Sequence, residues 1–312
     1  MALALRLSIC FPAGKEALAW QAELQRLLPS AAVDIWQAQT TNEQADYAVV
    51  WQPSQAFLDA QTQLKAIFNA GAGVDALLKL RLPAAPLVRL EDAGMGTQMA
   101  QYVAHAVLHH FRRFDVYAAH ASHGQWSQHG PRREADFPIG IMGYGVLGKA
   151  IAHALTALGF TVHAWARSAA QNATIPVFHG AAQLPNFLAR TRLLVCALPL
   201  TPETRHIVCR DTLAQLLPKA YFINIARGGH VNEADLLAAL ASGTLAGATL
   251  DVCENEPAGA DHPFWQHPLI RLTPHISAVT LRQDAMAQIV GKIAALESGS
   301  PISGVVDLAK SY

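Results

Sequence analysis

The sequence predicts an α/β protein with a doubly wound parallel-sheet domain and a second, smaller α/β domain. Short and continuously apolar runs alternate with helical stretches along the chain, a pattern typical of parallel sheets covered on both faces. A glycine-rich turn, Gly143-x-Gly-x-x-Gly148, follows one such run and opens a helical stretch. The length of 312 residues is enough for two domains.

The first hundred residues predict the smaller α/β unit. Its expected strands and helices are Arg6–Phe11, Lys15–Leu28, Ala45–Trp51, Gln55–Ala60, Leu64–Phe68 and Leu87–Leu90, of which the second and fourth are helical. From Thr97 to about His120 a helical pattern runs without Gly or Pro, so we expect one long connecting helix. Residues 121–137 are rich in Ser, His, Gly, Pro and Arg and predict a loop or an exposed arm.

A regular strand–helix series then begins. The expected strands are Pro138–Met142, Thr161–Ala166, Leu193–Leu198, Tyr221–Ile225, Ala246–Val252 and Ile270–Thr273. Helices are expected at Val146–Leu158, at Glu233–Ala241 with an Asn232 cap and Gly243 at its end, and at about Leu281–Ser298. We expect the last helix to return to the first domain, which gives domains of 1–96 with 280–312 and of 97–279.

Composition excludes several classes of protein. Apolar residues make up 52% and charged residues only 15% of the chain, which excludes a disordered protein. Twenty-three basic residues balance twenty-three acidic ones, so no strong field attracts nucleic acid or an anionic membrane. No run approaches the roughly 20 apolar residues that span a bilayer. Four scattered cysteines without a Cys-x-x-Cys pair predict a reduced, cytoplasmic protein.

The glycine turn predicts a Rossmann-type dinucleotide site, because it lies between an expected strand and an expected helix. Gly143 permits the tight turn, Gly145 lets the backbone approach a pyrophosphate, and Gly148 lets helix and strand pack closely. Backbone N–H groups at the start of the helix, at Val146 and Leu147, would face the phosphate charge.

The end of the next expected strand indicates which dinucleotide binds. An NAD enzyme usually places Asp or Glu there, about 20 residues after the turn, to bind the ribose hydroxyls. The position is Ala166 here, followed by Arg167 and Ser168, which offer a cation and a hydroxyl to a 2′-phosphate. We therefore predict a preference for NADPH, with NADH used more weakly.

Three short segments with polar residues follow successive expected strands. They lie at the carboxyl ends of the strands, where ligands bind in such sheets. They contain Arg227, Glu256 and His275. A guanidinium can bind a carboxylate bidentately, and an imidazolium can protonate a carbonyl oxygen as hydride arrives. A nearby carboxylate raises the pKa of an imidazole. The set predicts reduction of a 2-keto acid.

The order of five motifs resembles the D-isomer-specific 2-hydroxyacid dehydrogenases over essentially the whole chain. These motifs are Gly143-x-Gly-x-x-Gly148, Leu198-Pro-Leu-Thr-Pro-Glu-Thr204, Asn224-Ile-Ala-Arg227-Gly-Gly, Leu250-Asp-Val-x-x-x-Glu256-Pro and Pro274-His275. The segments Ala70–Asp75, Leu90–Gly96 and Phe111–Asp115 are most similar to the branch that acts on glyoxylate and hydroxypyruvate. The resemblance implies a Rossmann-type dinucleotide domain and a flavodoxin-like substrate domain.

The resemblance also implies roles for individual residues. Arg227 would orient the substrate, His275 would be the acid/base, and Glu256 would hold His275. Asp251 is similar to the family residue that contacts the nicotinamide carboxamide. Further cofactor contacts are implied at Leu198, Pro199, Thr201 and Ala226, and substrate contacts at Gly71, Ala72, Gly73, Val74, Trp51 and Met95. The family's Val-Ala-Glu is Met99-Ala-Gln101 here, so Gln101 is given no role.

The implied reaction is NADPH-dependent reduction of glyoxylate to glycolate and of hydroxypyruvate to D-glycerate. Another small 2-keto acid, or a cofactor-sensing role as in corepressors that resemble this family, remains an alternative. In relatives an arm crosses to a partner, so residues 97–137 predict a homodimer in which Trp126 reaches the neighbouring active site. His105, His109 and His110 share a helical stretch without an evident third metal ligand, and no metal is expected.

Overall fold

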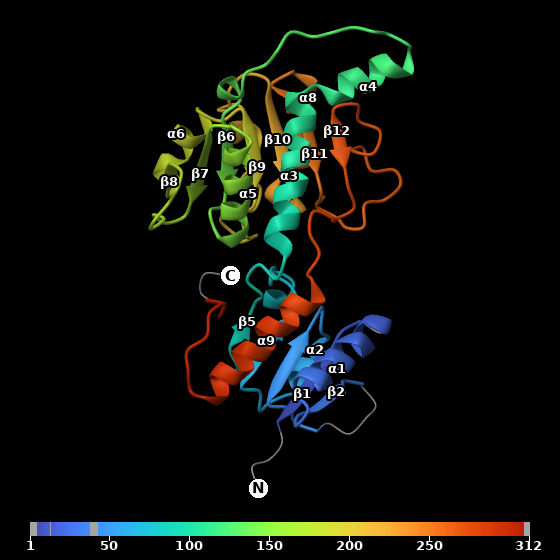
Figure 1. The fold of residues 1–312 in the computed structure, drawn as a ribbon, viewed down its shortest axis with the longest axis vertical. Helices are drawn as coiled ribbons and strands as arrows, with labels where there is room; N and C mark the ends of the chain where they lie inside the picture. The colour runs from blue at the N-terminus through green and yellow to red at the C-terminus, as the bar shows by residue number, and fades with distance from the viewer. Residues whose placement is uncertain (1–4, 13, 38–42, 309–312) are drawn as a thin grey trace. The chain divides into compact units, whose positions relative to one another are not determined.

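The computed structural model describes residues 5–12, 14–37 and 43–308 and divides into two compact units (Figure 1). One unit combines residues 1–94 with 280–312, and the other is 95–279. The first boundary lies two residues before the predicted one, so Met95 and Gly96 belong to the second unit and not to the first. No helix among the described residues is long and apolar enough to cross a bilayer.

The first unit contains, among its described residues, a parallel five-stranded sheet in the order β2-β1-β3-β4-β5. The strands are β1 Arg6–Cys10, β2 Ala32–Ile35, β3 Tyr47–Val50, β4 Ala66–Asn69 and β5 Leu87–Val88. The helices are α1 Lys15–Leu27, α2 Gln55–Ala60 and α9 Arg282–Glu297, with a 3-10 turn at Leu77–Lys79. This order is the flavodoxin-like one. Helix α9 packs beside α1, as expected for a returning chain.

The second unit contains, in the part that the structure describes, a parallel seven-stranded sheet in the order β12-β11-β10-β9-β6-β7-β8. Its strands are β6 Ile139–Met142, β7 Val162–Ala166, β8 Val177–His179, β9 Leu193–Cys196, β10 Ala220–Asn224, β11 Leu245–Leu250 and β12 Ile270–Leu272. The six strands from β8 to β11 follow the Rossmann order, with the switch point between β6 and β9, and β12 is added beside β11. The fold class predicted from the sequence is confirmed.

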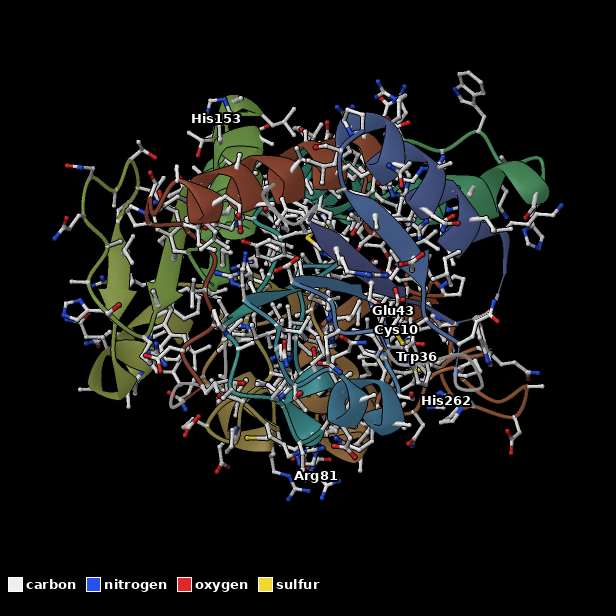
Figure 2. All side chains as sticks on the ribbon, turned by 90° about the horizontal axis from the view of Figure 1, so that it is seen from below. Cys10, Trp36, Glu43, Arg81, His153 and His262 are labelled. Atoms are coloured by element: carbon white, nitrogen blue, oxygen red, sulfur yellow. The ribbon has the colours of Figure 1, made fainter. Side chains whose placement is uncertain are left out.

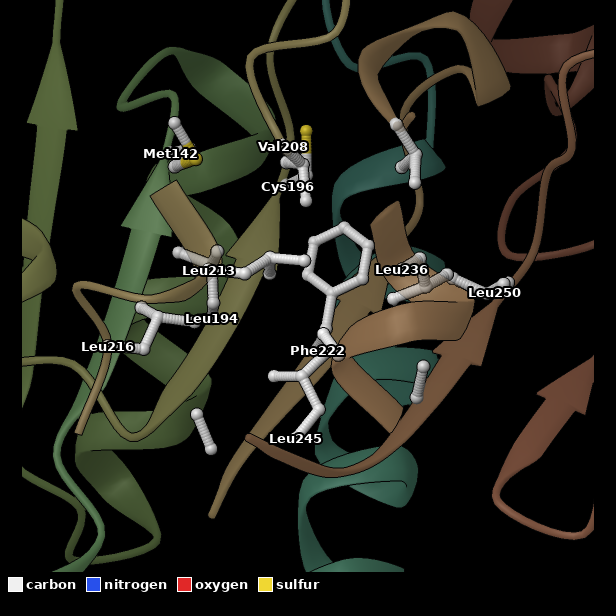
Figure 3. Close-up of a cluster of buried hydrophobic side chains, with 14 of the residues drawn as sticks. Met142, Leu194, Cys196, Val208, Leu213, Leu216, Phe222, Leu236, Leu245 and Leu250 are labelled. Carbon is white, nitrogen blue, oxygen red and sulfur yellow. The ribbon is translucent and has the colours of Figure 1, made fainter. Parts of the chain in front are cut away.

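Helices of the second unit cover both faces of its sheet. They are α3 Met95–Phe111, α4 Phe114–Ser122, α5 Val146–Ala157, α6 Leu184–Leu188, α7 Arg210–Leu213 and α8 Glu233–Ala241, with 3-10 turns at Glu134–Asp136, Ala181–Gln183 and Gly228–His230. Alternate residues of the strands point to opposite faces. Ile141 and Ile223 face α3 and α5, whereas Leu194 and Phe222 face α6, α7 and α8 (Figure 3).

Predicted caps around α8 are confirmed. The Asn232 side chain accepts a hydrogen bond from the Asp235 N–H at 3.1 Å, and Gly243 has a φ of 75°. The strands β2 and β8 were not predicted. Both lie at sheet edges and are partly exposed, so they lack the continuous apolar run that marked the central strands.

The single helix expected from Thr97 to His120 is wrong. Arg113 has a left-handed conformation, with φ of 56°, and separates α3 from α4. Helix α3 buries Val103, Val107 and Phe111 in the core beside α5, whereas α4 contains no buried residue. Packing therefore ends the first helix where its apolar side ends, although no Gly or Pro marks the break. The chain after α4 is exposed, and the Trp126 side chain is 96% exposed.

Candidate active site

The glycine loop connects β6 to α5 and is shaped by close packing. Gly143 has φ of 104°, and a Cβ at this position would lie 2.6 Å from the Ala197 carbonyl oxygen. A Cβ at Gly148 would lie 2.0 Å from the Gly143 carbonyl oxygen. By contrast, a Cβ at Gly145, the N-cap of α5, would meet nothing within 4 Å. Packing thus requires glycine at 143 and 148, whereas the space on the Cβ side of Gly145, at the start of α5, is open.

Two further segments lie at the same edge of the sheet as the glycine loop. Strand β7 ends at Ala166, and the next two residues, Arg167 and Ser168, are exposed. After β9, Thr204 Oγ1 donates to the Pro199 carbonyl at 2.7 Å and accepts from the Thr201 N–H at 2.8 Å. These two hydrogen bonds form a turn directly after Leu198, which is buried. Five of the residues predicted to contact the cofactor thus follow β7 or β9, the two strands that flank β6: Arg167, Ser168, Leu198, Pro199 and Thr201.

The loop that carries Arg227 is anchored at its base. Asn224, which is fully buried at the end of β10, accepts from the Ala226 N–H at 3.1 Å and donates to the Arg227 carbonyl at 3.0 Å. A Cβ at Gly228 would lie 1.9 Å from the Cys253 carbonyl carbon. Glycine at this position therefore lets the Arg227 loop contact the backbone of the loop that carries Glu256.

His230 was missed by sequence analysis. Its buried ring contacts the Arg227 carbonyl at Nδ1, 3.0 Å away, and the Pro199 carbonyl at Nε2, 3.2 Å away. Burial lowers its pKa, but the Cys196 side chain and the two carbonyls outweigh burial and raise the pKa to about 9. The ring links the Arg227 loop to the Pro199 turn. The feature of the sequence that could have identified His230 is its position three residues after Arg227.

His275 and Glu256 form the predicted pair. The His275 Nδ1 lies 2.7 Å from Glu256 Oε2, and the two side chains are 43% and 35% exposed. The hydrogen bond that His275 donates to the Glu256 carboxylate raises the pKa of His275, against the effect of burial. Burial acts to raise the pKa of Glu256, but the bond and charge of His275 outweigh it and lower this pKa. Since Nδ1 is held by Glu256, proton transfer to a substrate would use Nε2.

Arg227 is close enough to act on this pair. Its charge contributes to lowering the pKa of both Glu256 and His275. The structure therefore brings together the three side chains that the sequence predicted, from the ends of β10, β11 and β12. A cation, a carboxylate and an imidazole arranged in this way can bind an anionic carbonyl compound and protonate it.

Asp251 has a contact set that the sequence did not predict. It is fully buried at the end of β11, and its Oδ1 accepts from the Thr273 hydroxyl at 2.6 Å and from the Ile276 N–H at 2.8 Å. Its Oδ2 accepts from the Ser277 N–H at 2.7 Å. These bonds fold the chain on both sides of His275.

The predicted substrate residues of the first unit lie together at the ends of β3 and β4. The Trp51 ring covers Gly71, where a Cβ would lie 2.5 Å from the ring. Asn69 Nδ2 donates to the carbonyls of Gly71 and Gly73, at 2.9 Å each, and so shapes the loop that continues through Ala72 to Val74. Met95 is buried at the start of α3, in the second unit.

The first prediction concerns pH. Because Glu256 raises the pKa of His275, the acid form persists above pH 6.5, the ordinary pKa of the group. We expect kcat/KM for carbonyl reduction to be highest below the raised pKa and to fall as pH rises through it. Glu256→Gln should shift this fall to lower pH, as seen in pH profiles of initial rates.

Glu254→Gln is the matched control for this prediction. Glu254 lies two residues away and accepts from Arg205 Nη1 at 2.9 Å. The Glu254→Gln variant should have the same dependence of kcat/KM on pH as the parent. A profile that is the same in Glu256→Gln and the parent would contradict the role of Glu256.

Comparison with known proteins places these features in context. Residues 104–277 match the family model described as D-isomer specific 2-hydroxyacid dehydrogenase, NAD binding domain. The chain is 46% identical to glyoxylate/hydroxypyruvate reductase A of Yersinia enterocolitica over 304 residues, which cover 95% of this chain and 97% of that protein. It is 47% identical to the protein of the same name from Serratia proteamaculans, over 94% and 96% of the two chains.

Solved structures are similar over almost the whole length. A D-isomer specific 2-hydroxyacid dehydrogenase from Xanthobacter autotrophicus, in complex with NADPH and MES, is 38% identical with a TM-score of 0.93, covering 99% and 100% of the two chains. The NADPH-dependent glyoxylate/hydroxypyruvate reductase from Sinorhizobium meliloti, in complex with NADP and sulfate, is 36% identical with a TM-score of 0.90 over the same shares.

Proposed function

Because the chain belongs to the family of D-isomer-specific 2-hydroxyacid dehydrogenases, we propose that it reduces glyoxylate to glycolate and hydroxypyruvate to D-glycerate with NADPH. The observation that carries this proposal is the contact of His275 with Glu256 beside Arg227. The complete set supports turnover over a sensing role, because binding a cofactor requires no acid/base pair.

The residues of the second unit fit a bound dinucleotide. The open space at Gly145 and the first N–H groups of α5 suit a pyrophosphate. Arg167 and Ser168 after β7 suit a 2′-phosphate, and no carboxylate occupies position 166. Leu198, Pro199, Thr201 and Ala226 would lie along the cofactor, and Asp251 corresponds to the family residue that contacts the nicotinamide carboxamide.

The chemistry is divided among few groups. NADPH, when bound, supplies the hydride that reaches the carbonyl carbon. Arg227 binds the substrate carboxylate and polarises the adjacent carbonyl. His275 donates its Nε2 proton to the carbonyl oxygen, and Glu256 holds the imidazole in the charged form until that transfer. The family resemblance further implies substrate contacts for the backbone at Gly71–Val74 and for Trp51 and Met95.

A panel of 2-keto acids tests the proposed function. Glyoxylate, hydroxypyruvate, pyruvate and phenylpyruvate are compared at fixed NADPH by loss of reduced-cofactor absorbance. Glyoxylate and hydroxypyruvate should give the highest kcat/KM, and the product of hydroxypyruvate should be D-glycerate by chiral analysis. Higher kcat/KM for pyruvate or phenylpyruvate would replace this substrate assignment.

The second prediction concerns cofactor choice. Arg167→Ala removes the cation from the end of β7 and should raise the KM for NADPH about tenfold, the value of one charge-assisted hydrogen bond at an exposed site. The KM for NADH should stay within about twofold, since NADH carries no 2′-phosphate. Initial rates with both cofactors measure this. An equal increase for both would show that Arg167 does not read the 2′-phosphate.

The third prediction concerns assembly. We propose a homodimer in which the exposed arm carries Trp126 to the active site of the partner, supported by its 96% exposure and by an α4 without buried residues. Light scattering should give twice the 33.5 kDa chain mass, and Trp126→Ala should raise the KM for the keto acid. A monomeric mass, or unchanged kinetics in the variant, would contradict this arrangement.

We propose a cytoplasmic location from the state of the cysteines. Cys10, Cys196, Cys209 and Cys253 are all free thiols, as expected in the reducing cytoplasm. Neither nucleic acid nor membrane is proposed as a partner, because the net charge is zero.

A further inference from the structure

The turn that carries His275 has a backbone conformation that needs support. His275 has φ of 56°, in the left-handed region, which a residue other than glycine adopts only at a cost in free energy. Its N–H donates to the Asp251 carbonyl at 2.8 Å and to the Thr273 carbonyl at 3.0 Å. Surrounding contacts must therefore hold His275 in place.

The Asp251 carboxylate supplies those contacts. It accepts the N–H groups of Ile276 and Ser277, the two residues that directly follow His275. It also accepts the Thr273 hydroxyl, two residues before His275. A single buried side chain thus fixes the turn on both sides of the imidazole. The position of the Asp251 carboxylate oxygens therefore determines the position of the turn that carries His275.

A hydroxyl chain extends this support to helix α3. Tyr102 Oη lies 2.5 Å from Thr273 Oγ1, which in turn lies 2.6 Å from Asp251 Oδ1. Because Thr273 has one hydroxyl hydrogen and directs it to the carboxylate, Tyr102 is the donor to Thr273. Burial, together with the negative charge of Asp251 and against the Thr273 bond, raises the pKa of Tyr102 to about 12. The tyrosine therefore keeps its proton throughout the working pH range.

We propose that Tyr102 is a positioning residue for proton transfer: through Thr273 and Asp251 its hydroxyl holds the left-handed turn that presents His275. The inference rests on the role of His275 in the proposed function. Without the tyrosine donor, Thr273 Oγ1 loses a partner in a part-buried site and can turn away from Asp251. The turn then samples positions in which the imidazole leaves Glu256. Substrate binding by Arg227 is not part of this chain.

Tyr102→Phe tests the inference, with Tyr221→Phe as its matched control. Tyr221 is buried whereas Tyr102 is half-buried, but the Tyr221 hydroxyl likewise contacts a threonine, Thr249 Oγ1, at 2.8 Å. Both variants should lower the melting temperature by a similar amount, about 2–4 °C, because each loses one side-chain hydrogen bond between a tyrosine and a threonine. Only Tyr102→Phe should lower kcat, roughly tenfold, with KM for the keto acid within about twofold. Equal kcat in the two variants would overturn the inference.

Substitutions at Thr273 provide a second test of the same chain. Thr273→Val removes the hydroxyl and should lower kcat at least as much as Tyr102→Phe, and Thr273→Ser should recover most of the loss. The double variant Tyr102→Phe with Thr273→Val should have the kcat of Thr273→Val alone, because the two residues act in one chain. Additive losses would show that Tyr102 acts by another route.

A titration of His275 gives a readout that is independent of turnover. The imidazole signal of ¹⁵N-labelled protein is assigned by its absence in His275→Asn. Since the Glu256 bond raises the pKa of His275, Tyr102→Phe should lower it toward 6.5, and Tyr221→Phe should leave it unchanged. This comparison needs no substrate. If the parent reduces no 2-keto acid, the proposed function fails, and an unchanged His275 pKa in Tyr102→Phe separately refutes the positioning chain.

Discussion

His275→Asn is expected to lower kcat for glyoxylate about a hundred- to ten-thousandfold, the usual contribution of general acid catalysis. The asparagine amide keeps a polar group in the turn but has no proton to give at neutral pH. Residue 275 has a left-handed backbone, with φ of 56°. Asparagine tolerates this conformation well, so the substitution adds no conformational free-energy cost. The loss should therefore come from chemistry and leave folding intact.

Steady-state rates and NADPH fluorescence measure the two sides of this expectation. The dissociation constant for NADPH should change by no more than about twofold, because His275 follows β12 and the glycine loop follows β6. His153→Asn is the control, since His153 lies on the exposed side of α5 and points away from the ribbon (Figure 2). If His275→Asn keeps parental kcat, another group is the proton donor.

Arg227→Gln is expected to lower kcat/KM by roughly 30- to 1000-fold, or about 2–4 kcal/mol, because a charged, bidentate contact to the substrate is replaced by a neutral one. Most of the loss should appear in KM, since the guanidinium binds the carboxylate before reduction. Arg227→Lys should recover only part of it, because an ammonium lacks the planar pair of donors.

Arg210→Gln controls for removal of one positive charge. Its side chain is 78% exposed and lies 3.7 Å from Asp235. Kinetics with glyoxylate should be parental in this variant, and thermal unfolding should show that Arg227→Gln is folded. If Arg227→Gln lowers kcat alone and leaves KM at the parental value, Arg227 stabilises the transition state without binding the ground state.

Much of the fold could be predicted because local patterns and tertiary structure agree. The apolar runs that became β6, β9 and β10 are buried on both sides, which a continuous run predicts. The edge strands β2 and β8 lacked that pattern and were missed. The break at Arg113 was missed as well, because it depends on where α3 stops packing beside α5.

The chemistry of the site was readable for a related reason. Arg227, Glu256 and His275 each follow a strand, and parallel strands end at one edge of the sheet. The sequence also indicated that Asp251 belonged to the site. It could not indicate that the Asp251 carboxylate holds the His275 turn, since that follows from the course of the backbone.

The sequence by itself determined the fold class, the glycine loop and the identity of the three polar side chains, because each depends on a short stretch of residues and on the order of strands. Only the tertiary structure decided how these side chains are held. Tyr102 and Thr273 are 171 residues apart, and His230 joins two separate loops. Such contacts form only when helices and strands pack in three dimensions, and no local pattern of residues encodes them.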